Sequence, residues 1–345
     1  MREKLYMATT LIDSPLPIVA APMAGGPSTL DFARAVASAG GFPFIAGGYK
    51  TPDVLAEEID QLRRSATGFG VNLFVPSDAP VDEAAFTAYA EELTPEAAAH
   101  GLELDPTPVT DDDSWAGKLA LLIANPVPVV SLMFGLPDPA DIAALQKVGT
   151  RVLASVTNPD EARQSREAGV DGLIVQGASA GGHSAIFDPT QNPEPIGTDT
   201  LVRRVIQTVD LPVIAAGGVD GPQAVRRLLD AGAQAVVVGT MLLRTDEAGT
   251  SPTYLQALGN PAFTETVLTR AFTGRPARSL RNGFTDRHPE AITANPAVHH
   301  LTRALRQAAG RNGDADRLHL WAGTGWRNAP TGPAADVIRH LADDV

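Results

Sequence analysis

Eight short apolar runs, spaced along the first 240 residues, are the feature that most limits how this chain can fold. Each run ends in small or polar residues and is separated from the next by a stretch of helical pattern, as in successive βαβ units. The runs are 17–23, 42–47, 70–75, 127–134, 151–156, 172–177, 212–218 and 235–240. Continuous apolar runs of this length indicate parallel strands that are buried on both faces.

Helical patterns between these runs complete a barrel. Several candidates have Pro or Asp near their first residue, which favours a helix start. They cover 30–39, 52–64, 115–124, 138–147, 159–168, 198–208 and 221–231. A last helix is predicted at 335–343, after a long excursion. The pattern predicts an α/β fold, a (β/α)8 TIM barrel over residues 1–240, with residues 331–345 forming the closing helix that packs back on it.

Two insertions extend the predicted barrel. The excursion at 241–330 leaves from the end where the active sites of such barrels lie, so we expect a helical cap that serves as a substrate domain. A second insertion, 76–114, is rich in Pro and acidic residues. We expect its run Asp111–Asp113, with Ser114, to cap the helix that begins at 115, and assign it no further function.

Charge and composition exclude several classes of protein. The formal net charge is −13 and no run of five basic residues occurs, which disfavours nucleic acid as a partner. No apolar stretch reaches the roughly 20 residues of a membrane span, and the first residues lack the apolar region of a signal peptide, so we expect a cytoplasmic protein. With no cysteine, disulfides, thiolate metal sites and Fe–S clusters are excluded. Redox chemistry therefore requires an organic cofactor, and no metal ligands are assigned.

Glycines follow the seventh and eighth predicted strands. Gly217 and Gly218 lie in one loop, and Gly239 precedes Thr240 in the other. The loops after these two strands form the usual phosphate site of such barrels, because glycines let backbone N–H groups approach phosphate oxygens. The alternative is that each glycine merely turns the chain. The paired placement favours the phosphate site.

A histidine follows two glycines in the loop after the sixth strand. That strand ends in Gln176, and the loop contains Gly181, Gly182 and His183. Two glycines would allow a planar ring to lie against the backbone, and the histidine would face that ring. A loop histidine is by itself more often a polar surface residue than a catalytic one. Its position at the carboxyl end of a barrel strand favours the catalytic interpretation.

Nearly the whole chain resembles one family, the FMN-dependent nitronate monooxygenases, formerly called 2-nitropropane dioxygenases. The shared motifs are APMAGG (21–26), AGGYKTP (46–52), FGVNLFVP (69–76), VVSLMFGLP (129–137), QGASAGGHSA (176–185), AAGGV (215–219) and VVVGT (237–240). Two further motifs, AFTGRPARSLRNGF (271–284) and LWAGTG (320–325), look like the bacterial class I type. The resemblance implies an FMN-binding barrel with His183 as its active-site histidine.

The resemblance also implies contacts to the flavin for residues that match the motifs. Pro22 and Met23 would lie along the flavin ring, and Asn72 would hydrogen-bond its pyrimidine edge. Gln176 would reach the ring or the ribityl chain, and Gly181 and Gly182 would give the isoalloxazine room. Gly218, Gly239 and Thr240 would hold the phosphate. None of these roles follows from composition alone.

The chain also departs from the family pattern. Members often carry a histidine where this chain has Met133, and their cap helices bring tyrosines and a lysine to the active site. Tyr254 is one candidate for such a tyrosine. His299, Arg303 and Gln307 share one face of a predicted cap helix at i, i+4 and i+8. We expect Met133, Tyr254 and this helix face to contact the substrate, with the helix face pointing into the pocket and meeting an anion. The alternative is a solvated helix face.

The implied activity is oxidation of alkyl nitronates, or of nitroalkanes, by O2 to a carbonyl compound and nitrite. His183 would either hold the nitro oxygens or deprotonate a neutral nitroalkane, and the sequence leaves both roles open. The nearest rival is a flavin-dependent enoyl-thioester reductase that consumes NAD(P)H, because such reductases share the APMAGG and AGGH motifs. A barrel that binds flavin without catalysis, or phosphate without flavin, is the third interpretation, suggested by Met133 and the altered cap.

Overall fold

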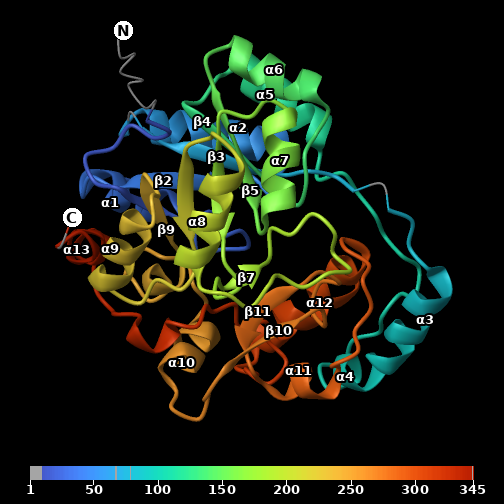
Figure 1. The fold of residues 1–345 in the computed structure, drawn as a ribbon. Coiled ribbons are helices and arrows are strands. Elements are labelled where there is room, and N and C mark those ends of the chain that lie inside the picture. Colours follow the sequence, from blue (N-terminus) through green and yellow to red (C-terminus); the bar gives the residue numbers. More distant parts are fainter. Residues whose placement is uncertain (1–9, 67, 78, 344) are drawn as a thin grey trace, which may run out of the picture.

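A parallel barrel that closes on itself organises the fold (Figure 1). The computed structural model describes residues 10–66, 68–77, 79–343 and 345. The barrel strands are β1 (Ile18–Ala20), β2 (Phe42–Ala46), β3 (Gly70–Phe74), β4 (Val129–Met133), β5 (Arg151–Val156), β6 (Gly172–Gln176), β8 (Val213–Ala216) and β9 (Ala235–Val238). Neighbours pair in parallel, and β9 closes the barrel against β1. The predicted barrel is confirmed, and every predicted run contains its strand.

Helices surround the strands where the sequence predicts them. They are α1 (Leu30–Ser38), α2 (Pro52–Arg63), α5 (Trp115–Ala124), α6 (Pro139–Lys147), α7 (Pro159–Glu167), α8 (Thr198–Thr208), α9 (Pro222–Asp230) and α13 (Ala334–Leu341). The side chains of Thr29, Thr51 and Asn158 accept backbone N–H groups at the starts of α1, α2 and α7. Helix α13 packs on α1 and α9, so the last helix fills the remaining place in the ring.

Apolar side chains fill the barrel interior as well as the layer beneath the helices. Phe42 and Phe44 meet edge to face inside the barrel, with 5.5 Å between their ring centroids. Leu11 is buried in the same cluster, and its N–H donates to Gln234 just before β9. The segment ahead of β1 therefore closes the amino end of the barrel, which leaves the carboxyl end for a site. Among the described residues, no helix is long and apolar enough to cross a membrane.

The segment between β9 and α13 contains a sheet as well as helices. Its elements are η1 (Thr240–Leu242), α10 (Pro252–Gly259), β10 (Thr266–Thr269), β11 (Ala277–Leu280), α11 (Gly283–Arg287), α12 (Ala297–Arg311) and η2 (Trp326–Asn328). Strands β10 and β11 form an antiparallel hairpin, and β11 also pairs with β7 (Gly182–His183) from the loop after β6. The sequence predicted only helices here because these strands are too short to show a clear alternation. The pairing fixes the His183 loop against the cap.

The insertion after β3 packs on the cap instead of on the barrel. It folds into α3 (Glu83–Glu92) and α4 (Thr94–Ala98), which lie beside α11 and α12 in Figure 1. Phe86 and Tyr89 are buried with Phe272 and Phe284, and the Tyr89 hydroxyl donates to the Ala271 carbonyl at 2.7 Å. Two segments that are far apart in the sequence therefore build one cap.

The acidic run before α5 does not cap that helix with its side chains as predicted. Ser114 occupies the N-cap position in a left-handed conformation, and its hydroxyl makes no capping hydrogen bond. Asp113 instead accepts the Tyr49 N–H at 2.9 Å and lies 2.7 Å from the ammonium of the buried Lys118. The capping prediction was wrong because the tertiary fold brings a buried cation and a loop N–H to this carboxylate.

Candidate active site

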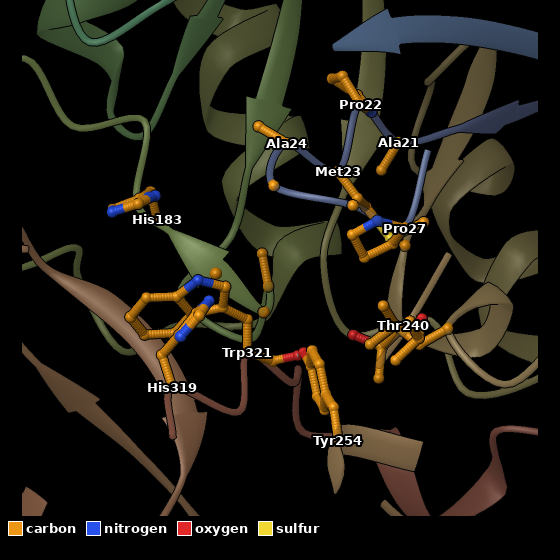
Figure 2. Close-up of a pocket in the computed structure, with 18 of the residues that line it drawn as sticks. Ala21, Pro22, Met23, Ala24, Pro27, His183, Thr240, Tyr254, His319 and Trp321 are labelled. Atoms are coloured by element: carbon orange, nitrogen blue, oxygen red, sulfur yellow. The ribbon is translucent and has the colours of Figure 1, made fainter. Parts of the chain in front are cut away.

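A cavity of about 1160 Å³ lies at the carboxyl ends of the barrel strands, between them and the cap. Figure 2 shows His183, Trp321, Tyr254 and Thr240 around it. The cavity is lined by every site residue that the sequence predicted, namely Pro22, Met23, Asn72, Met133, Gln176, Gly181, Gly182, His183, Gly217, Gly218, Gly239, Thr240, Tyr254, His299, Arg303 and Gln307. The fold thus brings residues from six barrel strands or their loops together with residues of α10 and α12.

Backbone donors gather where β8 and β9 end. Gly218 has a φ of 76°, a conformation that strains other residues. Within the described residues, the N–H groups of Gly218 and Thr240 donate to no protein acceptor. The Thr240 hydroxyl accepts the Gly323 N–H at 2.9 Å. Unpaired N–H groups beside a glycine loop fit the phosphate of a flavin mononucleotide.

The motif at 320–325 lines the cavity next to the loop that carries His183. The sequence analysis did not assign this motif to the site. A Cβ atom on Gly181 would lie 2.4 Å from the Gly323 nitrogen, so only glycine allows the two loops to approach this closely. The Thr324 N–H donates to the Ser179 carbonyl at 3.1 Å. The motif LWAGTG was the available signal, but spacing could not show that it reaches the His183 loop.

Two side-chain amides on barrel strands have fixed orientations. Gln176 donates to the His183 carbonyl at 3.2 Å and accepts the Ala185 N–H at 2.7 Å, so it holds the loop that carries His183. The buried Asn72 donates to Ser131 Oγ at 2.9 Å. Its Oδ1 makes no hydrogen bond within the part of the chain that the structure describes, and therefore fits an N–H donor such as that of a flavin pyrimidine edge.

His183 is neutral in this environment. Its Nε2 lies 2.9 Å from Thr273 Oγ1, and its ring contacts those of Phe134 and Trp321. Desolvation, followed by the positive charges of Arg275 and Arg306, lowers the pKa of His183 to about 3. An imidazole with this pKa is a hydrogen-bonding group at neutral pH, and a poor proton acceptor.

Tyr254 contributes its ring more than its hydroxyl. The hydroxyl donates to the Trp321 carbonyl (Figure 2), and burial raises the pKa of this phenol. The proton is therefore engaged by the backbone. Met133 lines the same cavity at the end of β4.

Comparison with known proteins identifies the family. A family model described as nitronate monooxygenase matches residues 8–344. The chain belongs to the nitronate monooxygenase family. A probable nitronate monooxygenase of Staphylococcus aureus is 32% identical over 342 residues, 98% of this chain and 96% of that relative. This nitronate monooxygenase family is flavin-dependent, in agreement with the unpaired N–H groups of Gly218 and Thr240 described above.

Two solved structures are similar to this nitronate monooxygenase family member. A nitroalkane oxidase from Streptomyces ansochromogenes is 46% identical with a TM-score of 0.91, and the match covers 96% of each chain. FabK from Thermotoga maritima is 27% identical with a TM-score of 0.73, over 96% of this chain and 93% of that one.

In this nitronate monooxygenase family member, the cap contains two buried arginines, Arg306 and Arg275, that sequence reasoning missed. Arg303 borders the cavity with an exposed side chain, whereas Arg306, three residues on, is 7% exposed. Arg275 is also buried, with its guanidinium 4.1 Å from the Phe134 ring centroid. Neither buried guanidinium forms a salt bridge within the described residues. The helical spacing i, i+7 from His299 could have indicated Arg306.

Proposed function

We propose that the protein oxidises alkyl nitronates to a carbonyl compound and nitrite, with FMN bound at the strand ends and O2 as the oxidant. One observation carries the proposal: a single cavity joins the glycine loop after β8 to the neutral His183 and to the buried cation Arg306, which forms no ion pair with a carboxylate in the described residues. Such a cavity favours an anionic ligand, because a buried charge without a counter-ion is costly. A nitronate is an anion.

FMN would be held along Pro22 and Met23, by Asn72 at one edge and by Gly218, Gly239 and Thr240 at its phosphate, with Gly181, Gly182 and Gly217 giving it room. When bound, FMN supplies the one-electron chemistry that this cysteine-free chain cannot supply itself. Gln176 holds the His183 loop against this site.

His183 holds the nitro oxygens of the substrate in this proposal and does not deprotonate it. Its lowered pKa, with burial as the main cause, makes it a weak base near neutral pH. A neutral imidazole can still donate a hydrogen bond to an anionic oxygen. The substrate therefore arrives as the nitronate, and neutral nitroalkanes are poor substrates.

The remaining cavity belongs to the rest of the substrate. We assign Met133, Tyr254 and His299 to its walls and Arg303 to its exposed border. We also propose residues 1–240 as the barrel domain, 241–330 as the substrate domain and 331–345 as the closing segment, with the insertion 76–114 added to the substrate domain. The cytoplasmic location and the absence of nucleic acid partners stay predictions.

Nitrite release tests the proposal. Purified protein under air is given simple alkyl nitronates and, separately, the corresponding nitroalkanes, and nitrite is measured. We expect nitrite from the nitronates at a much higher kcat/KM. Anaerobic mixing with NADH tests the rival: rapid bleaching of the flavin, with no nitrite from any nitronate, would establish a reductase and contradict the proposal.

A further inference from the structure

Arg306 and His299 contact each other within helix α12, and the donor and the acceptor of this contact can be assigned. Arg306 Nη2 lies 3.1 Å from His299 Nδ1 and donates to the His299 carbonyl at 2.9 Å. A guanidinium has only donors, so Nδ1 must accept this hydrogen bond. The neutral ring then carries its proton on Nε2.

The position of Arg306 is fixed in turn by its neighbours. Its Nε donates to Thr302 Oγ1 at 2.9 Å, and that hydroxyl donates to the Phe272 carbonyl at 2.5 Å. Arg306 is 7% exposed and forms no ion pair with a carboxylate in the described ranges. Burial lowers its pKa to about 10, so the side chain remains a cation at neutral pH.

The plane of the His299 ring is also fixed. The ring stacks on Tyr49 with 4.2 Å between centroids and 6° between planes, and Asp113 accepts the backbone N–H of Tyr49 at 2.9 Å. His299 Nε2 makes no hydrogen bond within the described residues, and the residue lines the cavity. Its free N–H is therefore the atom available to a bound molecule.

Protonation of His299 is opposed from every side. Burial is the largest cause and the positive charge of Arg306 is the second, and the neighbouring His183, His300 and His319 would repel a second imidazolium; together they lower the pKa of His299 to about 2. The ring therefore stays neutral and keeps one tautomer.

We propose that Arg306 is a positioning residue that fixes His299 as a neutral Nε2–H donor to an anionic oxygen of the substrate. His299 then contacts the substrate, and Arg306 acts through it. The barrel thus provides the neutral His183 to the cavity, and the cap provides His299 and His319, which are neutral as well. The substrate part of this inference rests on the proposed nitronate oxidation, whereas the tautomer does not.

The tautomer is measured directly on flavin-loaded protein that carries ¹⁵N-labelled histidine, without substrate. His299→Gln identifies the His299 signals. We expect the ring proton of His299 on Nε2 in the wild type and a mixture of tautomers in Arg306→Met. Arg303→Met, on the same helix, should keep the wild-type tautomer. If Arg306→Met does not fold, Arg306→Leu gives the same readout, because a leucine side chain has no N–H to donate to His299 Nδ1. A proton on Nδ1 in the wild type, or an unchanged tautomer in the Arg306 variants, overturns the proposal.

A double-mutant cycle tests the substrate contact with ethyl nitronate as the probe. Arg306→Met should raise KM by about 10- to 150-fold, the range for a charge-assisted hydrogen bond, with a smaller fall in kcat. In a His299→Gln background, where the amide donates without help from Arg306, the same change should raise KM less than about threefold. Full additivity would show that Arg306 does not act through His299. If the wild type releases no nitrite, the proposed function fails while the tautomer result still stands by itself.

Discussion

Ionisable groups at the cavity owe their state to their neighbours more than to the pH of the solvent. Burial, aided by Arg275 and Arg306, lowers the pKa of His183 to about 3, and burial also lowers the pKa of His319. The cations keep their charge while the histidines are neutral. This combination suits an anionic substrate that needs hydrogen-bond donors and no general base.

His183→Asn should therefore lower kcat/KM by a similar factor, about 10²-fold, for nitronates and for nitroalkanes, because the lost group binds the nitro oxygens in both. The wild-type kcat/KM for nitronates should show no histidine step between pH 6 and 8. Steady-state nitrite release across this range measures both. A loss confined to neutral nitroalkanes would instead identify His183 as a base, and no loss on either substrate would remove it from the mechanism.

The neutral histidines also predict acid lability. The folded-state pKa of His183 lies below its unfolded value of about 6.5, so the unfolded chain binds more protons below pH 6.5. Its stabilising contribution is complete above pH 6.5 and is lost as the pH falls toward 3. The unfolding free energy should drop by about 1.4 kcal/mol per pH unit for each such histidine. Denaturant unfolding between pH 6.5 and 5 measures this slope. His183→Asn should reduce it, and the exposed His340→Gln should not; equal slopes in all three proteins contradict the prediction.

Among the elements, helix α4 joins the two segments of the cap through a buried carboxylate. Glu96 is 4% exposed and accepts hydrogen bonds from Arg287, Arg317 and His288. Burial opposes its ionisation, but the hydrogen bonds from Arg287 and His288 outweigh it and lower the pKa of Glu96. The carboxylate therefore links α4 to α11 and to the segment before the 320–325 motif.

Glu96→Gln should destabilise the protein by about 2–4 kcal/mol, less than for a fully buried pair because its arginine partners are partly exposed. The measurement is the denaturant midpoint at pH 7, with the exposed Glu91→Gln as the matched control. Equal midpoints for the two variants would show that the cap segments are held together by apolar packing alone.

Helix α12 buries Arg306 and exposes Arg303, and this changes the expectation for Arg303. The sequence predicted that the helix face with Arg303 meets an anion, and a second anionic group on the substrate would fill this role. Because its side chain is exposed, its contact should be worth only about 0.2–1 kcal/mol. Arg303→Met should therefore reduce kcat/KM for a carboxylated nitronate by no more than about fivefold and leave a neutral-tailed one unchanged. Equal responses of both substrates would exclude a contact with the second anionic group.

At the scale of the whole molecule, the cavity is shared by the barrel, the hairpin β10–β11 with its cap helices, and the 320–325 motif. A ligand that fills this cavity touches parts that are separated by most of the sequence. Binding to the folded state alone then stabilises the entire fold by linkage.

FMN, and not FAD, should be released on heating, as mass spectrometry of the supernatant can show. Removing it should lower the melting temperature, since a ligand at 100 times its Kd contributes about 2.7 kcal/mol. Gly218→Ala should reduce flavin content, because the added Cβ strains a φ of 76° and lies 3.2 Å from Ser179 Cβ. Recovery of FAD, or of no flavin, would contradict the assignment of the phosphate site.

The sequence by itself determined the barrel and the residues at the ends of its strands. Buried parallel strands produce apolar runs, and a strand's last residues must lie at the same end as those of its neighbours, so Gln176 and Gly218 could be placed together from local pattern. The assignment of Asn72 needed the family resemblance as well. Only the tertiary structure decided what these residues contact. The pairing of β7 with β11, the packing of α3 and α4 on the cap, the diversion of Asp113 to Tyr49 and Lys118, and the burial of Arg306 all depend on long-range contacts. Burial and charge proximity are properties of the folded chain, and they set the protonation states on which the chemistry depends.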